Sequence, residues 1–218
     1  STGNMIYGVN LGAGTGNTVS NIIVKDNLAS STLYCVYSTG TSQEISNVVA
    51  ENNQTTGATA LAYGIYLNAS SGSKIRDSRV TNLKGGGNTY GIGAMNSANA
   101  VIENNIVENI TSFNPTTLTM SAHGIYMATS NAAVIANNSI SSVYDGTNKA
   151  TVNYISSGIM LASGVGYKVY YNSINMYGSN LGTNVAPGRS AGITLATVAV
   201  NSCDIRNNTF VNTMTRNT

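Results

Sequence analysis

The stretch HGIYMATSNAAVIANNSISSV, from His123 to Val143, decides the fold. It contains two short apolar segments separated by a bend of small residues, and the second segment carries an Asn-Asn pair. A period of two is typical of β-strands, so the alternation places Ile125 and Met127 inward and Tyr126 outward. Variants of this stretch recur along the whole chain, which predicts a repeat protein.

Each repeat begins with a small residue followed by an apolar one, and this pair serves as its anchor. From the small residue to a second apolar position the spacing is 11, 10, 11, 11, 11, 11 and 13 residues, whereas successive anchors lie 27 to 34 residues apart. The nearly constant interval predicts a fixed structural unit followed by connections of variable length. The seven anchors are Gly8-Val9, Cys35-Val36, Gly64-Ile65, Gly91-Ile92, Gly124-Ile125, Gly158-Ile159 and Gly192-Ile193.

The repeat predicts a coil of three short strands, because one coil cannot bury its inner face alone but stacked coils can. Helical repeats are disfavoured, since Asn and Gly interrupt each repeat and the apolar spacing is two. Like residues should then stack in columns about 4.8 Å apart. One column lies three residues after the second apolar position and should form an amide ladder: Asn105, Asn138, Asn172 and Asn208. Another lies seven residues after it: Asp26, Asn52, Asn82, Asn109 and Asn212.

The composition argues against a nucleic-acid partner and against insertion into a membrane. Only 8% of the 218 residues are charged and the net charge is +2, without a basic cluster, so we expect no nucleic-acid partner. No apolar run approaches the roughly 18 residues of a membrane-spanning helix, so we expect no membrane insertion. Cys35 and Cys203 belong to the second and seventh coils, roughly 24 Å apart at the strand spacing, which predicts two free thiols.

The repeats resemble the right-handed parallel β-helix repeats of the pectate-lyase-like class. The resemblance rests on IENNIVENI (Ile102 to Ile110), VIANNSISSV (Val134 to Val143) and IRNNTFVN (Ile205 to Asn212). It implies an all-β, right-handed parallel β-helix (solenoid) of about seven coils, with residues 1–218 as a single domain. That architecture is used by polysaccharide lyases and hydrolases, phage tailspikes, adhesins and repetitive segments of large secreted bacterial proteins.

Catalytic candidates are few. Pectate-lyase-like enzymes use clustered carboxylates that bind calcium and a nearby Arg or Lys base, and the best match is Asp77 and Glu103 with Arg76 and Arg79. The alternative is a solvated ladder of ion pairs. Separately, two opposite-charge neighbours on adjacent coils, Glu44 with Lys74 and Arg76 with Glu103, support the register of the coils. The Asp-Asp element of β-helix polygalacturonases is absent, and the sequence indicates no cofactor.

Aromatic residues supply the other candidates. Tyr37, Tyr66 and Tyr126 share an outward column, where their rings could bind a sugar or simply pack across strands. His123 could act as a general base, or it could continue an aromatic stack formed by Tyr7, Tyr34, Tyr63 and Tyr90. One histidine and two cysteines cannot form a zinc site of three or four nitrogen and sulfur ligands, so we expect no metal.

The sequence therefore favours a non-catalytic structural or adhesive module that is secreted or displayed at the cell surface. The alternative is a polysaccharide-binding or polysaccharide-degrading protein. Long connections after the fourth, fifth and sixth coils, SFNPTTLTMSA, YDGTNKATVNYIS and YGSNLGTNVAPGRSA, should lie side by side and could bind a polysaccharide or cell-surface ligand. Coils at both ends lack an obvious cap, which predicts a segment of a longer protein or a fibre subunit that associates end to end.

Overall fold

The computed structural model describes residues 4–113, 120–145, 155–178 and 189–215. These residues form two sheets in which every neighbouring pair of strands is parallel. The seven-stranded sheet has the order β1 (Ile6–Leu11), β4 (Leu33–Ser38), β7 (Ala62–Asn68), β10 (Thr89–Met95), β13 (Ala122–Ala128), β16 (Ile155–Ser163) and β19 (Arg189–Leu195).

The fourteen-stranded sheet provides the other two sides of each coil. Its strands are β2 (Thr18–Lys25), β3 (Leu28–Ala29), β5 (Glu44–Glu51), β6 (Gln54–Thr55), β8 (Lys74–Arg76), β9 (Arg79–Gly85), β11 (Val101–Glu103), β12 (Ile106–Ser112), β14 (Val134–Ala136), β15 (Ser139–Asp145), β17 (Lys168–Tyr170), β18 (Ser173–Met176), β20 (Asp204–Arg206) and β21 (Thr209–Asn212).

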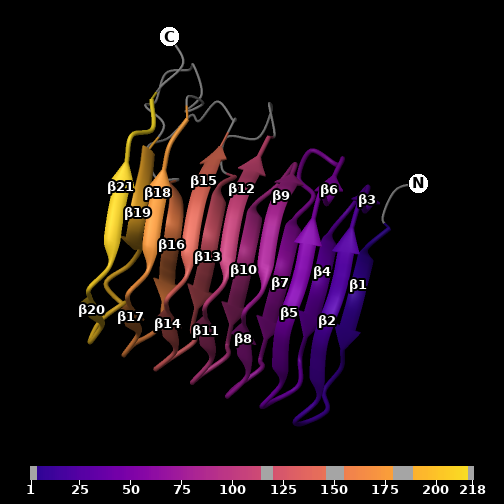
Figure 1. Ribbon diagram of the computed structural model, residues 1–218, viewed down its shortest axis with the longest axis horizontal. Coiled ribbons are helices and arrows are strands. Elements are labelled where there is room, and N and C mark those ends of the chain that lie inside the picture. The colour runs from indigo at the N-terminus through magenta and orange to yellow at the C-terminus, as the bar shows by residue number, and fades with distance from the viewer. Residues whose placement is uncertain (1–3, 114–119, 146–154, 179–188, 216–218) are drawn as a thin grey trace.

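The chain is a parallel β-solenoid, which confirms the expected fold class. In Figure 1 it runs down the rear sheet, turns at the lower edge and runs up the front sheet while it advances from right to left, so the coil is right-handed. Among the described residues no helix is long and apolar enough to cross a membrane.

The expected count of seven equivalent three-stranded coils was too high. Five coils, from β7–β9 to β19–β21, have three separate strands, whereas in the first two the second and third sides merge into the eight-residue strands β2 and β5. Ile22 and Val48 pair in register at the position where later coils place a hydrogen-bonding Ser or Asn. The side chains of Ile22 and Val48 cannot form hydrogen bonds to the backbone of the next coil. The backbone pairing between β2 and β5 therefore continues through the bend.

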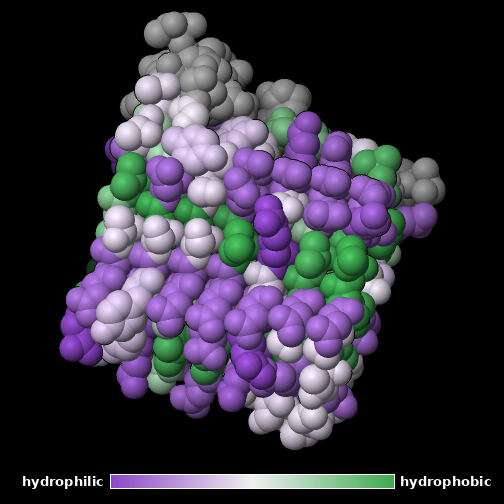
Figure 2. Space-filling view, in the orientation of Figure 1, coloured by the Kyte–Doolittle hydropathy of each residue, from purple (hydrophilic) through white to green (hydrophobic). Residues whose placement is uncertain are grey.

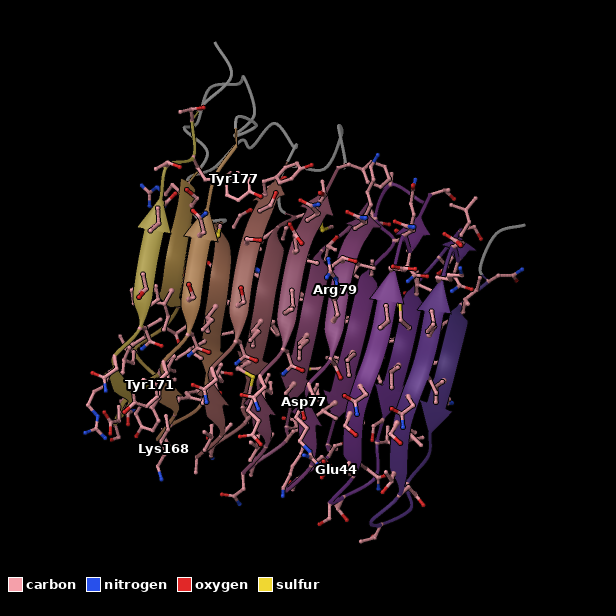
Figure 3. The ribbon with its side chains drawn as sticks, viewed as in Figure 1. Glu44, Asp77, Arg79, Lys168, Tyr171 and Tyr177 are labelled. Carbon is pink, nitrogen blue, oxygen red and sulfur yellow. The ribbon has the colours of Figure 1, made fainter. Side chains whose placement is uncertain are left out.

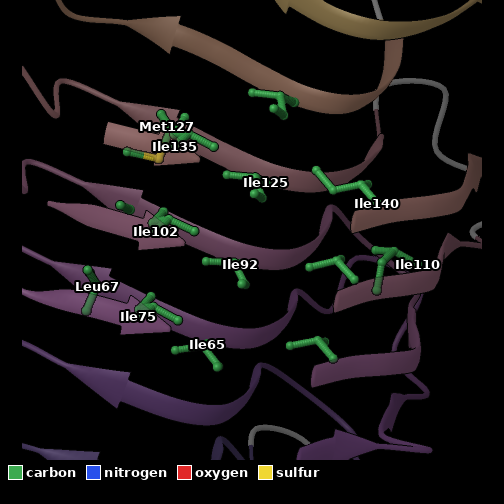
Figure 4. Close-up of a cluster of buried hydrophobic side chains, with 14 of the residues drawn as sticks. Ile65, Leu67, Ile75, Ile92, Ile102, Ile110, Ile125, Met127, Ile135 and Ile140 are labelled. Carbon is green, nitrogen blue, oxygen red and sulfur yellow. The ribbon is translucent and has the colours of Figure 1, made fainter. Parts of the chain in front are cut away.

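The anchors align as the spacing predicted. Strand pairing places their apolar residues in one row across the seven-stranded sheet: Val9, Val36, Ile65, Ile92, Ile125, Ile159 and Ile193. Ile125 and Met127 are fully buried, and Tyr126 lies on the outer side, as expected. Figure 4 shows the aliphatic side chains of the two sheets meeting inside the solenoid in successive layers.

In the six coils whose anchor begins with glycine, that glycine faces a larger side chain across the core. A Cβ atom added to Gly124 would lie 2.5 Å from Ile140 Cγ2 and 2.6 Å from the carbonyl oxygen of Gly158, too close for any real contact. In the second coil Cys35 occupies the position that glycine has in the other coils. Opposite it, Ala50 occupies the position that Ile140 has in the fifth coil. The two columns therefore compensate in volume, which keeps the coil cross-section constant.

The inner asparagine ladder forms as predicted from Asn105, Asn138, Asn172 and Asn208. Asn105 donates from its backbone N and from Nδ2 to Asn138 Oδ1, both at 3.0 Å, and Asn138 donates from Nδ2 to the Ile102 carbonyl at 2.9 Å. The preceding residue of each pair takes positive φ, as with Asn104 and Asn137 (57° and 55°), which Asn tolerates better than most residues. The repeated Asn-Asn pair thus makes the bend and satisfies the buried backbone groups there.

The three long connections fall mostly on residues 114–119, 146–154 and 179–188, which lie outside the described residues. Their expected side-by-side arrangement stays a prediction.

Candidate functional site

The predicted charged cluster consists of separate ion pairs. Arg76 donates from Nε to Glu44, and its Nη1 lies 3.7 Å from Asp77 Oδ2. Arg79 instead pairs with Glu108, at 3.6 Å between Nη2 and Oε2. Figure 3 shows Arg79 higher on the face than Asp77 and Glu44, so the ion pair of Arg79 is separate from the ion pairs of Arg76.

The predicted register of these charges is confirmed, although the strongest contact is diagonal. Glu44 pairs in register with Lys74, and Arg76 with Glu103. The hydrogen bond of Arg76 nevertheless goes to Glu44 on β5, two residues before Ser46, which is the register partner of Arg76 on that strand. That bond and the charge of Glu44 raise the pKa of Arg76 above its ordinary value. Arg76 is therefore engaged as a cation in an ion pair with Glu44.

The tyrosine column is a stacked aromatic ladder on the outer face of the seven-stranded sheet. Ring centroids lie 5.1 Å apart for Tyr7 and Tyr34, 4.7 Å for Tyr34 and Tyr63, and 4.9 Å for Tyr63 and Tyr90. His123 continues it, with its ring 5.8 Å from that of Tyr90 and nearly parallel. This arrangement fits the packing interpretation of His123 rather than a catalytic one.

The second aromatic column packs against the first. Tyr66 lies 4.4 Å from Tyr63 between ring centroids and is only 4% exposed. It lies over Gly93, where a Cβ atom would be 2.7 Å from the Tyr66 ring. Burial is the main cause that raises the pKa of Tyr63 and Tyr66 above the ordinary tyrosine value.

The three tyrosines of the predicted ligand-binding column, Tyr37, Tyr66 and Tyr126, therefore differ in how far their rings are exposed to solvent. Tyr66 offers little ring surface, while Tyr37 and Tyr126 are partly buried at the borders of the cluster. Tyr37 also accepts a hydrogen bond from Asn68 Nδ2 at 3.1 Å. Sugar binding by these rings stays a prediction.

A groove on the fourteen-stranded sheet was not among the predicted sites. Its floor is an outer row of amides, Asn52, Asn82 and Asn109, and the groove has a volume of about 450 Å³. The other residues that line it are Asn53, Gln54, Lys84, Thr111 and Tyr144. We call it the asparagine groove. Its sequence signal was the Asn column seven residues after the second apolar position.

Positive φ angles shape the asparagine groove. Asn52, Asn82 and Asn109 have φ of 54°, 54° and 55°, so three successive strands bend at the same height. Asn109 Nδ2 donates to Asn82 Oδ1, and Asn82 Nδ2 donates to Asn52 Oδ1, each at 3.0 Å. Figure 2 shows hydrophilic residues gathered across this face above several apolar side chains. The amides are thus held in a fixed orientation at the surface.

Neither cysteine is in a disulfide, which confirms the prediction of two free thiols. Burial raises the pKa of Cys35 to about 12, so its thiol is not ionised at neutral pH. Within the described residues no group of three or more His, Cys, Asp or Glu side chains is placed to hold a metal ion.

Comparison with protein-family models, curated proteins and solved structures found no match to this chain. The solenoid architecture expected from the resemblance is observed, but the comparisons do not support membership of the pectate-lyase-like class or kinship with bacterial surface proteins.

Proposed function

We propose that this chain is a non-catalytic structural module of a secreted or cell-surface protein, in which the solenoid is a rigid spacer and support for adhesion. The observation that carries this proposal is the use of side chains to connect coils. The inner asparagine ladder joins four consecutive coils through hydrogen bonds, of which the first two are buried and the last is partly buried. Buried polar groups that are fully satisfied make a structure rigid and specific.

A second ladder acts at the other bend. The backbone N of Ser70 donates to Ser97 Oγ at 3.0 Å, that of Ser97 to Ser130 Oγ at 3.1 Å, and that of Ser130 to the Tyr167 hydroxyl at 3.2 Å. On the outer face the stacked rings of Tyr34, Tyr63 and Tyr90 connect the second, third and fourth coils, and His123 continues the stack to the fifth. Three different kinds of contact therefore oppose sliding or bending between coils, as a spacer requires.

The charged side chains also fit a non-catalytic role. Three of the four residues of the predicted cluster, Asp77, Arg76 and Arg79, are engaged in ion pairs. Exposed ion pairs of this kind contribute little to stability, and here they satisfy charges on neighbouring strands.

The terminal strands suggest self-association. Among the described strands, β1 and β19 lie at the two edges of the seven-stranded sheet, each with one neighbour. Near the second edge, Leu195 and Phe210 are 45% and 42% exposed. Edge strands with exposed apolar residues pair readily with other strands, so we expect copies to stack end to end.

Electron microscopy of the purified chain tests the structural role. We expect stiff rods that join into filaments with an axial repeat near 4.8 Å, the strand spacing. Flexible or compact particles at all concentrations would contradict the proposal.

A cleavage assay tests the non-catalytic role. The chain is incubated with acidic and neutral polysaccharides, with and without calcium, and new chain ends are measured. We expect none. Cleavage abolished by Asp77→Asn but unaffected by Asp204→Asn, an acidic residue in the last coil, would show that the charged cluster is an active site.

A further inference from the structure

We propose that the stacked tyrosines on the outer face of the seven-stranded sheet form a radical relay, which passes hydrogen atoms from ring to ring across five coils. The relay carries a one-electron oxidation from the ring where it enters to Tyr7, the most exposed ring of the stack. The oxidant is of the peroxyl-radical class, which takes a hydrogen atom from a phenol. This inference goes beyond the structural role and does not depend on it, because phenylalanine rings would stiffen the solenoid as well.

The rings form an unbroken path along the solenoid axis. The strands that carry them, β1, β4, β7, β10 and β13, are neighbours in the rear sheet (Figure 1). The distances between ring centroids are 4.6 Å from Tyr126 to Tyr90, 4.9 Å from Tyr90 to Tyr63, 4.7 Å from Tyr63 to Tyr34 and 5.1 Å from Tyr34 to Tyr7. Each step is therefore a contact between rings, whereas direct transfer over the same four coils would span about 19 Å.

The strand register places the hydroxyl groups beside one another. Tyr63 is the in-register partner of both Tyr34 and Tyr90, and its ring plane differs from theirs by 8° and 19°. Identical side chains stacked in this way have their oxygens at about the same separation as their rings. A hydrogen atom can therefore pass from one phenol to the next while each ring stays in place.

Each transfer balances within the stack itself. In the first step the peroxyl radical takes the hydrogen atom of a phenol O–H, which yields a hydroperoxide and a tyrosyl radical. In each later step the O–H bond of the next ring breaks and an O–H bond forms on the radical ring, so one electron and one proton move together. Because both partners are tyrosine, this exchange is close to isoergic and runs in either direction.

Burial favours the neutral radical over charged forms. Tyr63, Tyr66 and Tyr90 are 8%, 4% and 8% exposed. Burial is the main cause that raises the pKa of all three phenols above the ordinary tyrosine value. A group removed from water resists any change that leaves it charged. Transfer of a neutral hydrogen atom is therefore the form of oxidation that suits these rings.

Tyr7 is the outlet of the relay. Its side chain is 39% exposed, and its hydroxyl donates to Met5 Sδ at 2.8 Å. A radical that reaches Tyr7 meets solvent, where a soluble hydrogen-atom donor such as ascorbate restores the phenol. At the other end the stack continues to the imidazole of His123, which has no O–H bond to give. Because the radical is consumed at Tyr7, the reversible exchange drains toward that ring.

The test attaches a photo-oxidant at the far end of the relay. Cys203→Ser removes the partly exposed thiol, and Met160→Cys provides a new one on β16, in register with Tyr126. A ruthenium polypyridyl complex linked to this thiol, photo-oxidised by persulfate, takes an electron from Tyr126 while the proton passes to the buffer. A nitroso spin trap and peptide mass spectrometry then identify the ring that holds the radical. We expect most of the adduct on Tyr7, in a yield that does not depend on protein concentration.

Two double variants of the labelled chain locate the path. Tyr63→Phe with Tyr66→Phe removes both hydroxyl groups of the third coil but keeps the rings, so the stack stays packed and the relay is cut. The adduct on Tyr7 should fall to the level of a sample kept in the dark. Tyr171→Phe with Tyr177→Phe is the matched control, because it makes the same change at two tyrosines outside the stack (Figure 3). It should leave the yield on Tyr7 unchanged.

Three results would overturn the proposal. The adduct of the labelled chain stays on Tyr126, the variant of Tyr63 and Tyr66 still delivers it to Tyr7, or the yield on Tyr7 rises with protein concentration. The last result would mean that the radical passes between molecules rather than along the stack. Circular dichroism of each variant confirms that the fold is retained, and none of these outcomes bears on the filament and cleavage tests of the structural role.

Discussion

Removal of one amide from the inner asparagine ladder should destabilise the solenoid strongly. In Asn138→Ala the backbone N–H of Asn105 loses its acceptor at 3.0 Å, and the carbonyl of Ile102 loses its donor at 2.9 Å. Asn138 itself is 1% exposed, so water does not reach these groups freely. Each buried, unsatisfied polar group costs about 1–3 kcal/mol. The expected loss of unfolding free energy is therefore about 2–6 kcal/mol.

The matched control is Asn175→Ala, the same chemical change on the exposed side of β18. A surface substitution of this kind should change stability by less than about 0.5 kcal/mol. Urea unfolding followed by circular dichroism measures both losses. Amide hydrogen exchange gives a local readout, because the Asn105 N–H should lose protection in Asn138→Ala. A loss below about 1 kcal/mol, or one equal to that of Asn175→Ala, would refute the view that the ladder holds the coils together.

Three further predictions test the core and the buried titratable groups. Gly124→Ala should lower the free energy of unfolding by about 1–3 kcal/mol through overpacking against Ile140. The double variant with Ile140→Ala should lose less than the sum of the two single losses. A strictly additive double-mutant cycle would contradict this. Burial raises the pKa of Tyr63 above 10.0, so its contribution to stability is present below pH 10 and is lost as the pH rises further, because the unfolded chain ionises first. Tyr63→Phe should flatten that alkaline loss in unfolding measurements, and an unchanged pH profile would argue against it. A thiol reagent should modify Cys203 in the native protein and Cys35 only after unfolding, since Cys35 is fully buried with a pKa of about 12; equal native rates would contradict the packing.

The candidate sites were harder to predict than the fold. Alternation correctly places Tyr66 on the outer face. Because Gly93 has no side chain, however, the Tyr66 ring packs flat over it and is buried. Register correctly places Arg76 beside Glu103, but a long flexible side chain can reach diagonally, and it bonds Glu44. Spacing specifies which backbone positions are neighbours, whereas side-chain direction depends on the volume and charge of everything around them.

The sequence by itself determined the solenoid, its register and its inner asparagine ladder. These follow from local rules: a period of two, bends that need positive φ, and an interval of 10 to 13 residues that recurs in every repeat. Only the tertiary structure decided which outward residues are accessible and that the outer amides form the floor of a groove. Exposure and concavity depend on how side chains from several coils fill the space between them, and no single repeat contains that information.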